Sequence, residues 1–284
     1  MKSAVFIISH ERPECVTYHN LRLCGYSGQI FIIIDDKDSK QDEYKNRYKD
    51  SVLIFSKADY SKADMCDLVP NLNSATIPKY AAFTFAQEMK LDAMAIFDDD
   101  LESFKYRYRD KNKIATKTMQ DYPFMQKVLD ACFEFVSEQN IPTCVSFYPA
   151  AKFFPDTYDK FIRQCINSFI TTPNFGLKLL GRSCPFSARF YEDEIFFVRE
   201  NTRGALCFAL QDFTFCSAIF ENANNKGGMD DVYQGYGLYS RKFQLVINNP
   251  WNSPMTIYDK GGEIRVATKN SDYTRIIPEK YKKH

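Results

Sequence analysis

The chain has 284 residues, a length that fits one large α/β domain or two small ones. Hydrophobic residues make up 45% of it, and 25 Phe with 18 Tyr supply ample core material, which argues against a disordered protein. The formal net charge of +1 gives no overall signature of a nucleic-acid-binding protein, although a neutral total can hide a local basic patch.

Cysteine usage and apolar segments indicate the compartment. The nine cysteines are odd in number, form no CxxC pair and lie mostly in apolar stretches, as is typical of reduced, buried thiols. The apolar run 4–8 is too short for a signal peptide, and no segment approaches the length of a membrane span. We therefore expect a soluble cytoplasmic protein with no membrane partner.

The first hundred residues alternate between strand and helix patterns. Continuous apolar runs predict strands buried on both faces, at 4–8, 30–34, 52–55 and 92–97. Helical spacing predicts intervening helices at 14–24, 38–47 and 76–90, and Gly25 ends the first of them. This alternation predicts a parallel, doubly wound sheet, in which ligands bind at the carboxyl ends of the strands.

The second half shows a less regular pattern. It contains an amphipathic helix at 122–139 and a strand at 143–148. Apolar, aromatic runs indicate further strands and a helix, at 195–198, 205–210 and 213–220. Residues 222–228, which include Gly227 and Gly228, are expected to form a loop. With no internal repeat and no low-complexity linker, a single domain over residues 1–284 is favoured.

Three consecutive aspartates, Asp98, Asp99 and Asp100, follow the strand at 92–97. Like charges this close repel, so each carboxyl resists ionisation unless a cation is present. Their hard oxygen atoms suit Mg²⁺ or Mn²⁺. In a strand-like geometry Asp98 and Asp100 point the same way and can address one ion, whereas Asp99 points elsewhere. The alternative is a solvated acidic loop or a helix N-cap.

Two other loops are expected at the same edge of the sheet. Ser9 and Arg12 follow the first strand, and an arginine there can pair with phosphate. Asp35 and Asp36 follow the second strand, where a carboxylate can accept hydrogen bonds from a ribose or a base. The alternatives are an ordinary surface loop and a turn. A lone histidine such as His10 is not expected to be a metal ligand.

Two further charged segments stand out. Glu192 and Asp193 precede an apolar run and can supply a general base that deprotonates an acceptor hydroxyl, or simply complement a helix N-terminus. The stretch 104–113 interleaves three aromatic residues with five basic ones. Such a stretch can hold nucleic acid by stacking and phosphate contacts, or be a hairpin with a solvated cationic face.

The ordered motifs along the chain resemble the TET-associated glycosyltransferase family, which is found mainly in bacteriophages. These motifs are ISHERP, IFIIIDD with Tyr44 downstream, AIFDDDLESF, CINSFITT, FYEDEIFFVRENTRGALCFA and NNKGG. The resemblance covers roughly residues 4–235 and implies a type A glycosyltransferase fold, that is, a Rossmann-like, mostly parallel central sheet flanked by helices. It also implies a nucleotide-sugar-binding half, residues 1–104, and an acceptor-binding half, residues 105–284.

The resemblance implies a role for each matching position. Metal ligation falls to Asp98 and Asp100, and catalysis to the Glu192-Asp193 pair, with Asp193 as the expected base. Contacts to the nucleotide sugar are implied for Ser9, Arg12, Asp35, Asp36, Asp98 and Asp99. Many type A transferases use a late histidine as a third metal ligand, but the only late candidate here is His284, so no third ligand is assigned.

The implied reaction is Mn²⁺- or Mg²⁺-dependent transfer of a sugar from UDP-glucose or UDP-arabinose to 5-hydroxymethylcytosine, or a similar base, in phage DNA within the host cytoplasm. The target base is expected to be flipped out of the stack. A glycan or small-molecule acceptor is the alternative that the near-neutral charge favours. A catalytically inactive binding module is a third reading, which the two acidic clusters oppose.

Overall fold

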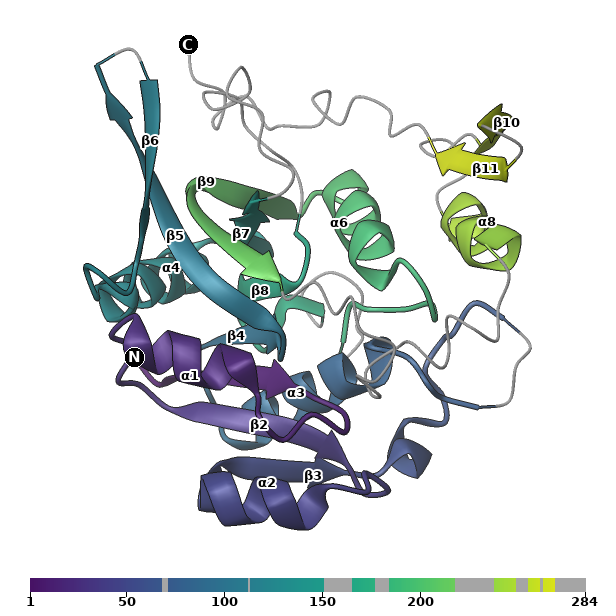
Figure 1. Cartoon of the computed structure of the whole chain (residues 1–284). Helices are drawn as coiled ribbons and strands as arrows, with labels where there is room; N and C mark the ends of the chain where they lie inside the picture. Colours follow the sequence, from purple (N-terminus) through teal and green to yellow (C-terminus); the bar gives the residue numbers. More distant parts are fainter. Residues whose placement is uncertain are drawn as a thin grey trace.

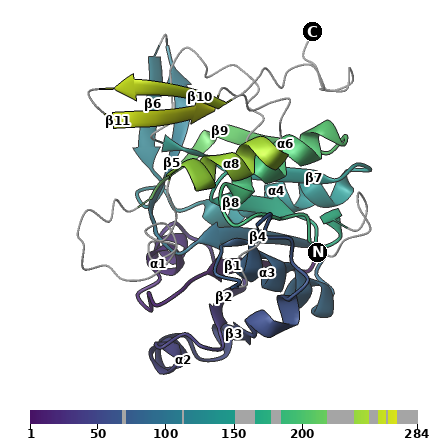
Figure 2. The same cartoon turned by 90° about the vertical axis from the view of Figure 1, so that its right-hand side faces the viewer.

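The computed structural model describes residues 1–67, 71–111, 113–150, 165–176, 184–217, 238–248, 255–260 and 263–268. In these residues one nine-stranded sheet has the order β3-β2-β1-β4-β8-β7-β9-β5-β6, and β10-β11 form a separate pair (Figure 1). Figure 2 shows the strands of the main sheet following one another from β3 at the bottom to β9 near the top. The strand–helix alternation of the sequence therefore builds one continuous α/β sheet.

The first half of the sheet is parallel, as predicted. Its elements are β1 (Ser3–Ile8), α1 (Val16–Leu23), β2 (Ile30–Asp35), α2 (Gln41–Tyr48), β3 (Val52–Phe55), α3 (Thr76–Glu88) and β4 (Ala93–Asp98). Strand β1 lies between β2 and β4, with Val5 in register with Ile30 and Ala95. The apolar runs are continuous because both faces are covered: one core includes residues of α1, α2 and α4, and the other includes residues of α3 and α6.

The second half is mostly antiparallel. Its elements are β5 (Leu101–Asp110), β6 (Lys113–Thr118), α4 (Met125–Glu138), β7 (Thr143–Pro149), β8 (Ser168–Thr171), α6 (Glu192–Thr202), β9 (Leu206–Ser217), α8 (Leu238–Asn248), β10 (Met255–Lys260) and β11 (Glu263–Thr268). Only β7 and β9 pair in parallel here, whereas β4-β8, β7-β8, β5-β9 and β5-β6 are antiparallel. The sheet as a whole is therefore mixed.

The structure makes two sequence expectations in this half more specific and leaves a third untested. The run 195–198 lies inside α6, because the helix buries Ile195 to Val198 against the core. The runs at 205–210 and 213–220 join into the single strand β9, which is long enough to pair with both β7 and β5. The expected loop at 222–228, with Gly227 and Gly228, lies outside the described residues.

All nine cysteines are free thiols, and seven of them are buried. Burial raises the pKa of the Cys132 thiol to about 12, so this thiol stays protonated and unreactive at neutral pH. The expectation of reduced, buried thiols is thus confirmed. In the described part of the chain, we find no helix with the length and apolar character that crossing a membrane requires.

Two glycines with positive φ offer a matched test of close packing. Gly25, just after α1, has a φ of 86°, and a Cβ there would lie 2.8 Å from the carbonyl oxygen of Pro123. Gly204, after α6, has a φ of 94°, and a Cβ there would meet nothing within 4 Å. Both replacements by alanine strain the backbone, but only the first also collides with a neighbouring segment.

We expect Gly204→Ala to lower the free energy of unfolding by about 1 kcal/mol and Gly25→Ala by about 2 to 4 kcal/mol. Urea-induced unfolding followed by circular dichroism measures both. Equal losses for the two variants would contradict the close approach of residues 25 and 123.

Candidate active site

The aspartate triplet forms the link between β4, which ends at Asp98, and β5, which begins at Leu101. The first turn of α1 fixes the backbone of this link. The Thr17 hydroxyl donates to the carbonyl of Asp98 at 2.6 Å and accepts the Leu101 N–H at 2.8 Å, and the Thr17 N–H donates to the Asp99 carbonyl at 3.1 Å. The three carboxylates therefore project from a backbone that is held without their help.

Asp99 points toward the loop after β1. Its Oδ2 accepts the Ser9 hydroxyl at 2.5 Å, and its Oδ1 lies 3.4 Å from the Arg12 guanidinium. A chain of hydrogen bonds continues from there: the Tyr44 hydroxyl donates to Ser9 at 2.6 Å and accepts the Arg12 N–H at 2.9 Å. Ser9, Arg12 and Asp99 thus form one buried network, and the loops after β1 and β4 meet at the predicted edge of the sheet.

Among the described residues, one oxygen of Asp100 has no hydrogen-bond partner. Its Oδ1 is buried and accepts no hydrogen bond from the described residues. Burial, together with the neighbouring Asp99 carboxylate, raises the pKa of Asp100 to about 6. A buried carboxylate oxygen without a donor is costly, and a bound cation would remove that cost.

Asp98 stands among other acids. Burial raises its pKa well above the usual range, and the carboxylates of Asp193, Asp100 and Glu192 raise it further, whereas the Lys79 ammonium lowers it. The structure therefore brings the predicted metal ligands into electrostatic contact with the predicted catalytic pair, although the two motifs lie about ninety residues apart in the sequence.

Lys79 of α3 connects these acids. Its side chain is 1% exposed, and its Nζ bonds to Glu192 Oε1 at 2.9 Å and to Asp193 Oδ1. The ammonium also lies 4.7 Å and 4.9 Å from the ring centroids of Phe169 and Phe186. Burial opposes its charge, but the Asp193 and Glu192 carboxylates outweigh that effect and raise the pKa of Lys79. Lys79 is therefore a permanent buried cation.

The sequence analysis missed Lys79. The available signal was a lysine on the apolar face of the helix predicted at 76–90, with Ala82, Phe83 and Ala86 around it. A lysine in that position requires a buried counter-charge.

Glu192 and Asp193 occupy the first turn of α6, and their surroundings differ. Asp193 has both oxygens engaged, Oδ1 with Lys79 and Oδ2 with the N–H of Asn167 at 2.9 Å. Glu192 uses Oε1 for Lys79, and no hydrogen bond from another described residue is found at its Oε2. Burial raises the pKa of Glu192. Of the two, Glu192 has an oxygen available to accept a proton.

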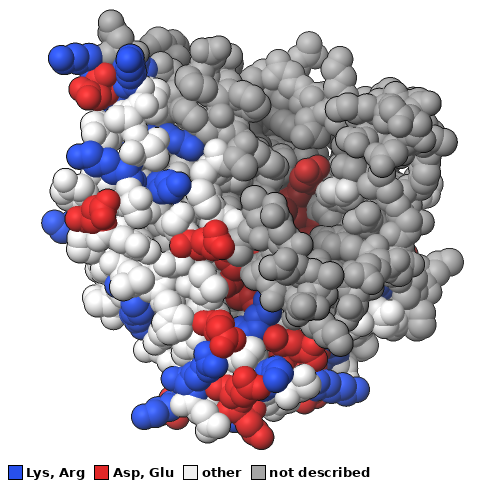
Figure 3. Space-filling view, in the orientation of Figure 1, with Lys and Arg blue, Asp and Glu red and all other residues white. Residues whose placement is uncertain are grey.

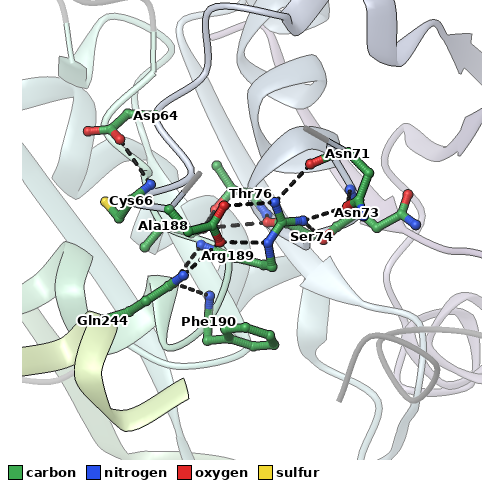
Figure 4. Close-up of polar contacts among 11 residues, drawn as sticks. Asp64, Cys66, Asn71, Asn73, Ser74, Thr76, Ala188, Arg189, Phe190 and Gln244 are labelled. Atoms are coloured by element: carbon green, nitrogen blue, oxygen red, sulfur yellow. Dashed lines mark hydrogen bonds and ion pairs between the residues drawn. The ribbon is translucent and has the colours of Figure 1, made fainter. Parts of the chain in front are cut away.

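A buried arginine fixes the segment that leads into α6 (Figure 4). Arg189 is fully buried and forms a two-pronged ion pair with Asp67, at 2.8 Å and 3.1 Å. It also donates to the side-chain oxygen of Asn71 and the carbonyl of Asn73, both at 2.8 Å. Gln244 of α8 accepts the N–H of Arg189 at 3.0 Å. The acidic start of α6 is thus held by contacts with Asp67, Asn71 and Asn73 and with α8.

The loop after β2 provides a separate polar group. Asp35 is buried, pairs with Lys57 and accepts the Lys37 N–H at 2.8 Å, whereas Asp36 is exposed. Burial opposes ionisation of Asp35, but the Lys57 and Lys37 hydrogen bonds prevail and lower its pKa. Asp36 is the member of the pair whose carboxylate faces solvent, where a nucleoside can reach it.

Asp38, which the sequence analysis did not single out, joins this loop to the loop after β1. It is buried, accepts the Glu11 N–H at 2.8 Å and lies 3.5 Å from Nδ1 of His10. The hydrogen bond to Asp38 raises the pKa of His10. His10 is therefore engaged away from the triplet.

The site's charges suit a divalent ion. The site contains more acidic side chains than cations. The acids are Asp98, Asp99, Asp100, Glu192 and Asp193, and the cations are Lys79 and Arg12. No group of three or more His, Cys, Asp or Glu side chains in the described residues is arranged to hold a metal. Mg²⁺ usually binds one or two carboxylates, with waters and substrate phosphates completing its shell. Asp98 and Asp100, with the unpartnered Asp100 oxygen, fit that pattern.

Comparison with known proteins gives one match over most of the chain. A family model described as TET-Associated Glycosyltransferase matches residues 3–228. No curated protein matches the sequence.

Similar solved structures are distant. Mannose-1-phosphate geranyltransferase from Thermus thermophilus has 11% identity and a TM-score of 0.38 over 76% of this chain and 74% of that one. A cytidylyltransferase from Leptospira borgpetersenii serovar Hardjo-bovis has 12% identity and a TM-score of 0.41 over 75% of this chain and 77% of that one. GalNAc-T7 with UDP, GalNAc and Mn²⁺ has 12% identity and a TM-score of 0.47 over 88% of this chain and 48% of that one. At these scores the likeness identifies neither donor nor acceptor.

Lys79→Met tests the buried cation. We expect it to lower the free energy of unfolding by about 3 to 5 kcal/mol near pH 8, because Glu192 and Asp193 lose their counter-charge. In the variant the folded-state pKa of Glu192 rises further above its unfolded value. The cost of keeping Glu192 ionised in the folded variant is therefore absent at low pH and grows as the pH rises from the unfolded-state pKa to the folded-state pKa of Glu192. The loss of unfolding free energy in Lys79→Met is thus smaller at about pH 5 than near pH 8.

Urea unfolding at the two pH values measures this difference. Lys40→Met, which removes an exposed pair with Glu43, is the control and should change stability little at either pH. A Lys79→Met loss that does not depend on pH would contradict the role of Lys79 as the counter-ion.

Proposed function

The chain belongs to the TET-associated glycosyltransferase family, and on this premise we propose that it transfers a sugar from a nucleotide sugar to a hydroxyl group of a modified cytosine in DNA. The proposed donors are UDP-glucose and UDP-arabinose, and the proposed acceptor is 5-hydroxymethylcytosine or a similar base. One observation carries the proposal: Asp98 and Asp100 lie at the end of β4 beside the buried group formed by Lys79, Glu192 and Asp193.

The donor is proposed to bind along the edge formed by the loops after β1, β2 and β4. The Arg12 guanidinium is 19% exposed at this edge and can meet a phosphate, and the exposed Asp36 can meet the nucleoside. Ser9 and Asp99 bond to each other, so we assign them to the support of this loop. Asp98 and Asp100 would hold Mn²⁺ or Mg²⁺, which supplies electrophilic stabilisation of the diphosphate leaving group.

Glu192 is the proposed general base. Its Oε2 would take the proton of the acceptor hydroxyl as the hydroxyl oxygen bonds to the anomeric carbon. The bond from that carbon to the diphosphate oxygen breaks, and the nucleoside diphosphate leaves with the electron pair. Asp193, which the sequence favours as the base, has both oxygens engaged, so we assign it to holding Lys79 and Asn167 in place.

A transfer assay tests the acceptor. The protein is incubated with UDP-glucose or UDP-arabinose, Mn²⁺, and DNA with or without 5-hydroxymethylcytosine, and the nucleosides are then weighed by mass spectrometry. We expect a mass gain only in the modified DNA. Release of UDP without a gain in DNA would replace DNA by a glycan or small-molecule acceptor.

The variants Glu192→Gln and Asp193→Asn test which of the two acids is the general base. Removing a general base lowers kcat by about 10²- to 10⁴-fold, and we expect this loss for Glu192→Gln with donor binding retained. Glu138→Gln, an exposed change on α4, is the control. If Asp193→Asn lost the activity while Glu192→Gln kept it, the base would be Asp193.

Metal addition tests the proposed ion site. We expect Mn²⁺ with UDP to raise the melting temperature of the wild type, since a ligand that binds only the folded state stabilises it. Asp100→Asn is expected to lose this increase, because the amide cannot replace the unpartnered carboxylate oxygen as an ionic ligand. Asp50→Asn, on the exposed surface, is the control. A full Mn²⁺ response in Asp100→Asn would overturn the assignment.

A further inference from the structure

The hairpin of β5 and β6 extends beyond the main sheet. Strand β5 pairs with β9 only from Leu101 to Tyr106, and it pairs with β6 from Lys105 to Asp110. Its outer residues therefore have a neighbouring strand on one side only, and β6 is the edge of the sheet. In Figure 1 this two-stranded part, residues 105–118, projects at the upper left, and we call it the ribbon.

The ribbon concentrates positive charge. Residues 104–118 contain six Lys or Arg and one Asp, a net charge of +5, whereas the whole chain carries +1 and the remaining residues therefore sum to −4. Figure 3 shows the basic side chains gathered over this hairpin. The near-neutral total thus hides a strongly basic projection on an otherwise acidic protein.

The aromatic residues of the ribbon are covered by neighbouring side chains, and Tyr106 packs against the main core. Tyr106 lies opposite Lys117 in the ladder, and the Tyr106 and Tyr108 rings are 5.9 Å apart. The Lys117 ammonium lies 5.7 Å from the Tyr108 ring and 5.0 Å from that of Tyr122, which is 51% exposed. Because neighbouring rings and Lys117 already cover the tyrosine faces, the ribbon offers cations rather than open stacking platforms.

Three lysines of the ribbon form no ion pair in the described part of the chain. Lys111, Lys113 and Lys117 are exposed, and no ion pair between described residues includes them. The cation–π contacts account for Lys117 as a stabiliser of the hairpin, but Lys111 and Lys113 at the tip make no such contact in the described structure. Exposed lysines on an edge strand also deter strand pairing between molecules, and that function alone requires no clustering at the tip.

Strand β5 connects the ribbon to the candidate active site. Leu101, the first residue of β5, directly follows Asp100. The ten residues of β5 span roughly 33 Å, which matches about ten base pairs of duplex DNA at a rise of 3.4 Å per step. A duplex lying along the ribbon would place its phosphates on the lysines while a nucleotide near its inner end reached the triplet.

We infer that the ribbon is a docking surface for the phosphate backbone of duplex DNA, with Lys111 and Lys113 among its contacts. This inference rests on the proposed DNA acceptor and adds the element that binds the strands around the target base. Contacts of this kind carry no sequence information, so the ribbon supplies affinity and orientation rather than base choice.

A salt titration tests the ribbon. Binding of a fluorescent duplex is measured by anisotropy over a range of NaCl concentrations for the wild type and for Lys111→Gln/Lys113→Gln. We expect weaker binding at low salt and a slope of log K against log salt that is reduced by about 1.8, because each phosphate contact contributes about 0.9. Thermal melting of both proteins shows that the variant remains folded.

A control variant with the same loss of charge at another surface shows whether the position of the lysines matters. Lys45→Gln/Lys49→Gln removes two exposed lysines near the end of α2, and Lys49 has a φ of 49°, close to the 54° of Lys111. We expect this variant to keep the wild-type slope. Equal slopes for the two variants would contradict the assignment of the ribbon as a DNA-docking surface, while leaving the proposed function intact. A wild type that binds UDP with Mn²⁺ but no DNA would overturn both the ribbon and the DNA acceptor.

Discussion

The buried ammonium of Lys79 is the contact on which the site depends. Burying a lysine is costly unless carboxylates surround it, and here Glu192 and Asp193 do so with Asp98 nearby. In turn, the acidic start of α6 can lie beside the acidic end of β4 only because a cation stands between them. One ion-pair group therefore joins α3, α6 and β4, three elements that the sequence separates widely.

The three aspartates of the triplet have different partners. The sequence analysis assumed a strand-like triplet, but β4 ends at Asp98, and Asp99 and Asp100 form the turn before β5. From this turn Asp99 contacts Ser9 and Arg12, whereas one buried oxygen of Asp100 has no hydrogen-bond partner among the described residues. The four parallel strands, by contrast, could be read from the sequence, because they depend on local periodicity. Continuous apolar runs indicated burial on both faces, and the charges at their ends indicated the edge where the loops meet.

Other parts of the site could not be read in this way. Lys79 and Glu192 are 113 positions apart, and Arg189 and Asp67 are 122 apart, so neither pair leaves a local pattern. The proposal of Glu192 rather than Asp193 as the base is supported by the bond from the Asn167 N–H to Asp193, a contact that only the folded chain reveals. Likewise, the apolar run 195–198 suits either a buried strand or a helix, and its place in α6 is decided by packing against the core.

The large sequence separation between Lys79 and its acidic partners also affects the order in which the chain can fold. A nascent chain that has completed β1 to β4 already contains α3, yet the two acids that neutralise Lys79 are still about ninety residues from synthesis. Until α6 arrives, that lysine must stay hydrated, which keeps α3 from docking fully. The parallel half is thus expected to remain loosely packed by itself and to become rigid only when the second half is made. The two halves of the sheet would then mature as one cooperative unit.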